Sequence, residues 1–171
     1  MKTVELFRHT ANEGDRLTPA GVTAALNIGA TLPGGYAVAV SSGAQRATQT
    51  VACLLAGLGE KVSGGVVVID SLRSAVEEEW RSAYQAAGAG DIASLRRVNS
   101  DLVERDSAAL AAGLRAAFAL LPENGRALAV GHSPTNEAAI YGLTGVVVEP
   151  VARGGSVVVA MIGDGYLVDD R

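Results

Sequence analysis

The stretch VELFRH, residues 4–9, decides the fold, because a short, largely apolar run ends there directly in an arginine and a histidine. A second run with a similar ending, RALAVGH, lies at residues 126–132. Short apolar runs bounded by turn residues are typical of strands buried inside a sheet. The chain has two histidines, and each of them follows one of these strands. The starting point is therefore a pair of buried strands with a histidine beyond each carboxyl end.

Helical segments alternate with the strands along the chain. Thr18 and Pro19 predict an N-cap and a first helical position, and the helix they open runs to about residue 32. Further strands are expected at 36–40 and 66–69, further helices at about 41–58, 74–84, 91–121 (continuous or broken) and 133–141, and a hairpin at 156–162 and 166–168. This order predicts an α/β fold: a three-layer α/β/α sandwich with a mostly parallel central sheet. We expect a single domain over residues 1–171.

Composition limits the classes of partner. The net charge is −4 and the sequence has no run rich in lysine or arginine, so we expect neither nucleic acid nor a membrane as a partner. The single cysteine, Cys53, allows no internal disulfide and no cysteine–histidine zinc cluster, and it is interpreted as a buried small hydrophobe. The N-terminus lacks the long apolar segment of a signal peptide, so a cytoplasmic protein is expected.

Imidazoles and guanidiniums are predicted to gather at one edge of the sheet. Ligands of an open parallel sheet bind beyond the carboxyl ends of its strands, where His9 and His132 both fall. The strand at 36–40 adds Ser42 and then Arg46, which lies in the first turn of a helix and therefore favours an anion bound there. Guanidinium forks fit phosphate oxygens, and a neutral imidazole can attack phosphorus. With Arg8, the set predicts a site for phosphoryl transfer that uses no metal.

Four segments, taken in order, resemble the histidine phosphatase superfamily, which has the phosphoglycerate-mutase-like fold. RHT at 8–10 resembles its Arg-His-Gly signature, and LTPAG at 17–21 resembles its Leu-Thr-x-x-Gly segment. SSGAQRATQT at 41–50 resembles its Ser-Ser-x-x-x-Arg-Ala-x-Gln-Thr segment, and VGHS at 130–133 resembles the segment of its second histidine. The ordered set covers most of the chain and is far more specific than a single Arg-His pair.

The resemblance implies a phosphatase of the short branch of this superfamily, without metal or other cofactor, acting on a phosphorylated small molecule or a phosphoprotein. His9 would become a phosphohistidine intermediate, while Arg8, Arg46 and His132 would complete the phosphate pocket. Thr10 replaces the glycine of the signature, where it would narrow the pocket or lend a hydroxyl to the phosphate. The candidates for binding substrate are Thr10, Asn12 and Ser133.

The sequence departs from the family at the residue that protonates the leaving group. Family members often carry this acid in a Leu-x-Glu segment after the third strand, whereas this chain has LRS at 72–74. Glu77 is our candidate for the acid, because it lies in the first turn of the helix that follows. The alternative is that Glu77 only completes a capping box with Ser74. Glu78 and Glu79 are expected to be solvated.

Other functions remain in competition. GHSPT at 131–135 imitates the nucleophile elbow of a serine hydrolase, but its last glycine is missing and no histidine follows Ser133. A catalytically weak or inactive module that binds phosphate or a phosphoprotein is the alternative function, motivated by the missing acid at Ser74. A mutase is disfavoured by the short segment between Asp70 and Leu121. The same missing acid suggests a substrate with an easy leaving group, such as phosphohistidine on a protein.

Overall fold

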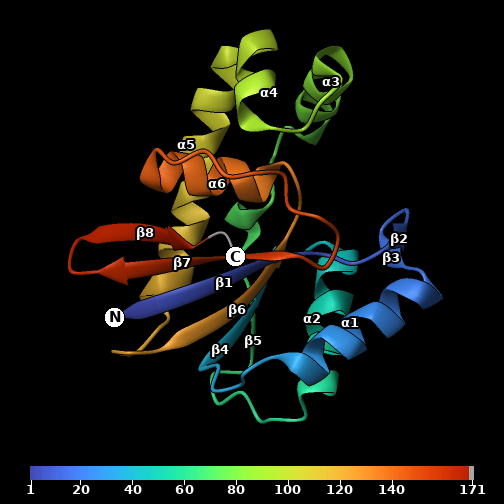
Figure 1. Cartoon of the computed structure of the whole chain (residues 1–171), viewed down its shortest axis with the longest axis vertical. Helices are drawn as coiled ribbons and strands as arrows, with labels where there is room; N and C mark the ends of the chain where they lie inside the picture. The colour runs from blue at the N-terminus through green and yellow to red at the C-terminus, as the bar shows by residue number, and fades with distance from the viewer. Residues whose placement is uncertain (170–171) are drawn as a thin grey trace.

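The computed structural model describes residues 1–169 and contains a six-stranded sheet covered by helices (Figure 1). The strands of this sheet are β1 (Lys2–Arg8), β4 (Val38–Ser41), β5 (Val66–Val68), β6 (Arg126–Gly131), β7 (Ser156–Ile162) and β8 (Gly165–Asp169). They lie in the order β5-β4-β6-β1-β7-β8. The first four run parallel to one another, and the β7–β8 hairpin adds two antiparallel strands beside β1. The predicted mostly parallel sheet is therefore confirmed.

Helices cover both faces of the sheet. They are α1 (Pro19–Thr31), α2 (Gln45–Leu58), α3 (Glu77–Ala87), α4 (Ile92–Val98), α5 (Ser100–Ala119), α6 (Thr135–Thr144) and the short 3-10 turn η1 (Asp70–Leu72). Figure 1 shows α1 and α2 on one side of the sheet and α5 and α6 on the other, with α3 and α4 beyond them. The three-layer α/β/α sandwich is thus confirmed.

Neighbouring residues of β1 point into different layers, as side chains of a strand must. Leu6 belongs to the larger apolar cluster, which includes Leu110 and Leu114 of α5. Phe7 belongs to the smaller cluster, together with Leu54 of α2 and Val130 of β6. Strands that are apolar on both faces need cover on both faces, and this explains why the strand runs in the sequence are nearly continuous rather than alternating.

Two helix boundaries differ from the expectation. The helix expected from residue 41 begins at Gln45, because Ser41 still pairs in β4 and Ala44 is the N-cap. The helix expected over 91–121 is broken at Asn99. The side chain of Asn99 accepts a hydrogen bond from the backbone N–H of Leu102, at 3.1 Å, and so caps the second of the two helices.

The predicted capping box of Ser74 and Glu77 is wrong. Helix α3 begins at Glu77 with Val76 as its N-cap, and no side chain caps it. The Ser74 hydroxyl lies 2.7 Å from a carboxylate oxygen of Asp106, to which it donates. Because Asp106 lies on α5, Ser74 fastens the start of α3 to the neighbouring helix. Cys53 is half-buried rather than fully buried.

Between the strand β1 and the helix α1, the chain forms a small separate hairpin. Its strands are β2 (Asn12–Glu13) and β3 (Arg16–Leu17), joined by the turn at Gly14 and Asp15. The β7–β8 hairpin lies where the sequence predicts it. The expected domain extends to residue 171, and its last two residues lie outside the described range.

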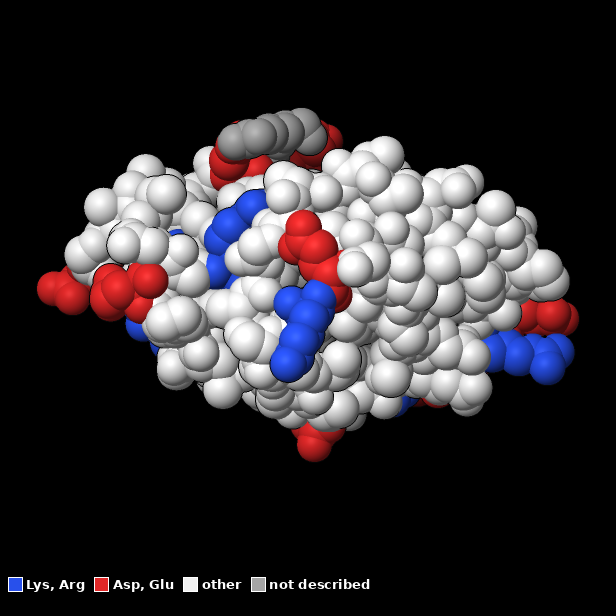
Figure 2. All heavy atoms as spheres, turned by 90° about the horizontal axis from the view of Figure 1, so that it is seen from below, with Lys and Arg blue, Asp and Glu red and all other residues white. Residues whose placement is uncertain are grey.

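The surface of the molecule carries few charged side chains on the face seen in Figure 2, where basic and acidic groups are interspersed. The helices α1 and α2 contribute a single charged residue between them, Arg46. Over residues 1–169, none of the helices is long and apolar enough to cross a membrane.

Candidate active site

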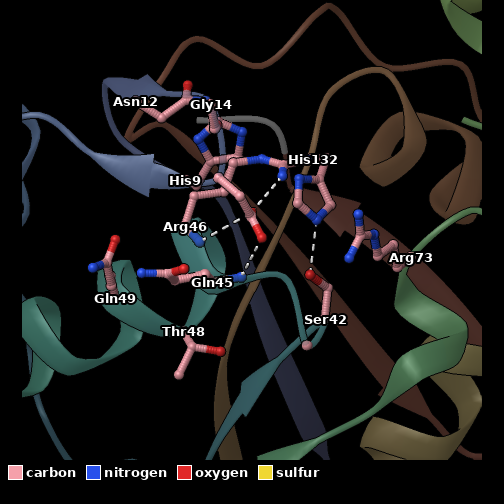
Figure 3. Close-up of polar contacts among 12 residues, drawn as sticks. His9, Asn12, Gly14, Ser42, Gln45, Arg46, Thr48, Gln49, Arg73 and His132 are labelled. Atoms are coloured by element: carbon pink, nitrogen blue, oxygen red, sulfur yellow. Dashed lines mark hydrogen bonds and ion pairs between the residues drawn. The ribbon is translucent and has the colours of Figure 1, made fainter.

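The carboxyl ends of three neighbouring strands bring the two histidines together. The sheet pairing continues one residue beyond the strands, since the backbone N–H of His9 donates to Gly131 and that of Ser42 donates to Val130, both at 3.1 Å. The rings of His9 and His132 therefore lie side by side, with centroids 5.3 Å apart (Figure 3). The expectation that they share one edge of the sheet is confirmed, although 123 positions separate them in sequence.

The ring of His9 has a defined tautomer. Its Nδ1 lies 2.9 Å from the carbonyl oxygen of Thr10, and a carbonyl can only accept a hydrogen bond. Nδ1 must therefore carry the proton, which leaves a lone pair on Nε2. Burial, with further contributions from the nearby guanidiniums of Arg46 and Arg8, lowers the pKa of His9 to about 4. At neutral pH, His9 is thus a neutral imidazole with a free nucleophilic nitrogen.

The second imidazole is held by Ser42, the residue that follows β4. His132 Nε2 lies 2.8 Å from the hydroxyl oxygen of Ser42, and Figure 3 marks this contact. Burial first, and then the charge of Arg46, lowers the pKa of His132 to about 3. The Ser42 hydroxyl can donate to Nε2 or accept from it, and the proton of the neutral ring lies on Nδ1 when the hydroxyl donates. This Nδ1 is buried and has no hydrogen-bond partner within residues 1–169.

Arg8 is the last residue of β1 and is half-buried. Its Nη1 donates to the carbonyl oxygen of Val151 at 3.0 Å. Its Nε is buried and has no hydrogen-bond partner among the described residues. Burial lowers the pKa of Arg8, and the carboxylate of Glu137 partly offsets this effect. An arginine stays charged under such conditions, so Arg8 provides a fixed positive charge with donors to spare.

Arg46 lies in the first turn of α2, as expected, and it already binds an anion. Its Nη1 lies 2.7 Å from a carboxylate oxygen of Asp15. The same carboxylate accepts the backbone N–H groups of Gln45 at 3.3 Å and of Arg46 at 3.4 Å. Arg46 was expected to favour an anion at this helix N-terminus, and the chain itself supplies one. Asp15, which the hairpin carries back to α2, was not among the residues predicted from the sequence.

Glu77 lines the same cavity as Arg46 and His132, and the volume of this cavity is about 230 Å³. Its carboxylate receives two hydrogen bonds from Arg73, at 2.6 and 3.3 Å. The Arg73 guanidinium accordingly lowers the pKa of Glu77. Glu77 is therefore an ionised carboxylate beside the pocket, rather than an acid that holds a proton at rest.

The glutamates that follow Glu77 point away from this chemistry. Glu78 pairs with Arg81 at 2.7 Å, and Glu79 pairs with Arg105 at 3.0 Å. Both glutamates are exposed to solvent, as the sequence analysis expected.

The three substrate-binding candidates use their donors within the protein. The Thr10 hydroxyl donates to the carbonyl of Gly21 at 2.8 Å, and the Asn12 amide donates within its own turn at 2.8 Å. The Ser133 hydroxyl donates to Glu137 at 2.6 Å. In this arrangement Thr10 does not lend its hydroxyl proton to a phosphate. Ser133 does line the cavity beside Glu77.

Asn136 is a structural tie that the sequence analysis missed. Its side-chain oxygen accepts the backbone N–H of His132 at 3.1 Å, while its amide donates to the carbonyl of Phe7 at 3.0 Å. One side chain thus fastens the second histidine to the strand that leads to the first. A Cβ at Gly131 would lie 2.2 Å from the Asn136 side-chain oxygen, so a larger residue there would displace this tie.

Glu137 is a second residue that the sequence analysis missed. Its side chain is fully buried, and one carboxylate oxygen accepts both the Ser133 hydroxyl and the backbone N–H of Val151, at 2.6 and 2.7 Å. Burial raises its pKa. The signal for both residues is a polar Asn-Glu pair in the first turn of a helix that is otherwise apolar.

No group of three or more His, Cys, Asp or Glu side chains is placed to hold a metal ion anywhere in residues 1–169.

Comparison with solved structures identifies the class of fold. The chain is similar to a mycobacterial glucosyl-3-phosphoglycerate phosphatase, with a TM-score of 0.65, 14% sequence identity, and 98% of this chain and 97% of that chain covered. It is similar to a phosphoserine phosphatase from Entamoeba histolytica (TM-score 0.63, 17% identity, 98% and 95% covered). It is also similar to the alpha-ribazole phosphatase from Shigella flexneri (TM-score 0.60, 16% identity, 98% and 95% covered).

These three neighbours are histidine phosphatases. At such sequence identities the likeness establishes the fold alone, and the chain has the phosphoglycerate-mutase-like fold of these neighbours. Neither the protein-family models nor the curated proteins give a match to this sequence.

Proposed function

We propose that this protein is a metal-independent phosphatase that forms a covalent phosphohistidine intermediate on His9. The observation that carries the proposal is the hydrogen bond between His9 Nδ1 and the carbonyl of Thr10, which leaves the Nε2 lone pair free. The guanidiniums of Arg46 and Arg8 are near enough to lower the pKa of His9, and the ring centroid of His132 lies 5.3 Å from that of His9. A nucleophile surrounded by fixed donors is what phosphoryl transfer requires of a protein.

Two buried nitrogens near the proposed nucleophile suit a phosphate. Arg8 Nε and His132 Nδ1 are both buried and unpartnered within the described residues. A buried donor without an acceptor costs about 1–3 kcal/mol, and phosphate oxygens would supply acceptors for Arg8 Nε and, in the tautomer that carries its proton on Nδ1, for His132. Arg46 adds a guanidinium at the N-terminus of α2, where backbone N–H groups favour an anion.

The reaction proceeds in two halves. In the first half, His9 Nε2 donates its lone pair to phosphorus, and the bond from phosphorus to the leaving group breaks. The leaving atom takes the electron pair and then a proton. In the second half, a water oxygen attacks phosphorus and loses a proton, and the bond between phosphorus and Nε2 breaks. Inorganic phosphate is released, and the imidazole of His9 is restored.

Glu77 is the group we propose for proton transfer, because its carboxylate lines the cavity beside His132. Its ion pair with Arg73 keeps it ionised, so it is ready to take a proton from the attacking water. Donating a proton in the first half requires that it first bind one, which the ion pair opposes. Substrates whose leaving groups need little protonation are therefore favoured, and phosphohistidine on a protein is such a substrate.

The test of the nucleophile is the variant His9→Ala. We expect its turnover of p-nitrophenyl phosphate to fall by at least about 10,000-fold, the scale seen when a covalent nucleophile is removed. Rapid acid-free quenching of the wild-type enzyme with labelled substrate should trap phosphate on Nε2 of His9. Turnover retained by His9→Ala, or label found on the other ring nitrogen, would refute the mechanism.

A matched control separates catalysis from folding. His9→Ala keeps Arg8 and Arg46, so it should still bind inorganic phosphate. Arg115 is exposed and lies on α5, outside the site, so Arg115→Gln should turn over like the wild type. Assays with and without a chelator test the absence of a metal, because a metal-independent enzyme keeps its rate in both.

A further inference from the structure

The carboxylate of Asp15 occupies the donors that the proposed function assigns to phosphate. It binds the guanidinium of Arg46 at 2.7 Å and two backbone N–H groups of the first turn of α2, at 3.3 and 3.4 Å. A guanidinium combined with a helix N-terminus is a typical binding site for a phosphate group. The side chain of an acidic residue has replaced the external anion.

The same contacts keep Asp15 ionised. Burial alone would raise the pKa of Asp15, but the hydrogen bonds from Arg46 and Gln45 outweigh this effect and lower it. The carboxylate is therefore charged at neutral pH and attracts Arg46 as a phosphate would. The Arg46 side chain is mostly covered, with an exposed fraction of 17%, and Asp15 takes both its Nη1 and the adjoining helix N-terminus, so a phosphate that uses this pair of donors must displace the carboxylate.

We propose that Asp15 is a built-in competitor that sets the affinity of the site for phosphate. A phosphate group must displace the carboxylate from Arg46 before it binds, and the return of the carboxylate helps to expel the product. The role in catalysis rests on the proposed phosphatase function. The competition itself concerns any phosphate anion at Arg46 and holds whether or not turnover follows.

The hairpin that carries Asp15 is built for this exchange. Its strands are two residues long each, and its turn contains Gly14 at a positive φ of 58° with open space around it. The Asp15 side chain is about half exposed, at 49%, so few buried contacts oppose its departure. The base of the hairpin is fixed separately, since the backbone N–H of Leu17 donates to Gln49 at 2.8 Å. The tip can thus move while the base remains in place.

The size of the effect follows from the competition. When only a fraction of the protein is free to bind, the apparent dissociation constant equals the intrinsic one divided by that fraction. If the carboxylate is bound in about nine of ten molecules, phosphate affinity is lowered about tenfold, which corresponds to ~1.4 kcal/mol. Removing the charge of Asp15 should recover this affinity.

The experiment measures the binding of inorganic phosphate by titration calorimetry to the full chain. We expect Asp15→Asn, which keeps the size and removes the charge, to bind phosphate about tenfold more tightly than the wild type. Glu13→Gln is the matched control, because it removes the same charge from an exposed position on the same hairpin. This control should bind phosphate within about twofold of the wild type.

Asp15→Ala is the second variant, and it should also tighten binding, because it lacks any group that could compete. Weaker or unchanged binding in Asp15→Asn and Asp15→Ala would overturn the proposal, since it would mean that Asp15 positions Arg46 or does nothing. Equal tightening in Glu13→Gln would also overturn it, as a general charge effect. Failure of all proteins to bind phosphate in the millimolar range would overturn it as well.

The same set of proteins separates this proposal from the proposed function. Tighter phosphate binding in Asp15→Asn, without any turnover of p-nitrophenyl phosphate by the wild type, would support the competition by Asp15 and reject the proposed phosphatase function. Turnover that depends on His9, with unchanged phosphate binding in Asp15→Asn, would support the phosphatase function and overturn the competition by Asp15.

Discussion

At the scale of single residues, the chemistry of the site depends on which side-chain atoms carry protons, and the sequence alone does not show this. A histidine at a strand end is in most proteins a structural residue, and the hydrogen bond from Nδ1 to the Thr10 carbonyl is what gives His9 a free Nε2. Glu77 shows the converse case. It lines the cavity, but its pairing with Arg73 lowers its pKa and holds it ionised, so it begins the reaction without a proton to donate.

Glu77→Gln should slow substrates with poor leaving groups more than substrates with good ones. An alkyl phosphate needs a proton on its leaving oxygen, so we expect its kcat/KM to fall by about 10²-fold or more, in line with general acid–base catalysis. The leaving group of p-nitrophenyl phosphate is a stable phenolate that needs no proton, so the fall in kcat/KM should be severalfold smaller for this substrate. Steady-state kinetics on both substrates measures the difference.

The exposed neighbour provides the control for this prediction. Glu78→Gln removes an equal charge from the same turn of α3, and Glu78 pairs with the exposed Arg81 at 2.7 Å. Its effect on both substrates should be small. Losses of equal size for the two substrates in Glu77→Gln would show that Glu77 supports the structure of the wall and transfers no proton.

At the scale of secondary-structure elements, the strand ends explain what could be foreseen. The location of Arg8, His9, Arg46 and His132 at one edge of the sheet was predictable, because adjacent parallel strands end at a common edge and Arg46 lies in the first turn of the helix that follows β4. The long-range contacts made by the first turn of α6 were not predictable in the same way. Glu137 is buried there among apolar neighbours and binds a backbone N–H of residue 151, and no local sequence pattern announces a contact across 14 positions.

Glu137 is expected to position Arg8 through the segment at Val151. Its carboxylate accepts the Val151 N–H, while the Val151 carbonyl accepts Arg8 Nη1. Glu137→Ala removes an acceptor of two hydrogen bonds and leaves a cavity, so it should lower the free energy of unfolding by about 2–4 kcal/mol. It should also raise KM for p-nitrophenyl phosphate more than it lowers kcat, because Arg8 acts on phosphate binding.

Glu137→Gln distinguishes positioning from charge. The amide keeps an oxygen that can accept from Ser133 and Val151, so most of the phosphate affinity should return. A KM as high in Glu137→Gln as in Glu137→Ala would show instead that the negative charge beside Arg8 is what the site needs.

At the scale of the whole molecule, the fold requires two imidazoles to remain neutral inside it. Both histidines are buried where the two helical layers meet the edge of the sheet, with pKa values of about 4 and about 3 against 6.5 for the free side chain. The two apolar layers are built mainly from aliphatic residues and alanine. The burial of the histidines follows only from the tertiary structure.

Stability should therefore fall as the pH drops from about 6.5 toward 5. In this range the unfolded chain binds protons on its histidines and the folded chain does not, so the free energy of unfolding decreases as pH falls. The limiting slope is about 1.4 kcal/mol per pH unit for each histidine. Denaturant unfolding of the wild type at a series of pH values measures this slope.

The double variant with His9→Gln and His132→Gln isolates the contribution of the histidines. The buried Glu137, whose pKa is raised, opposes the trend because its protonation stabilises the folded state as pH falls, and it is present in both proteins. Asp15 and Glu77 have lowered pKa values and lose their stabilising effect only at lower pH, below the range measured. The wild type should therefore show the steeper slope. Equal slopes would mean that His9 and His132 titrate normally in the folded protein. His9 would then be largely protonated at mildly acidic pH, and the nucleophile proposed for the reaction would be lost there together with its lone pair.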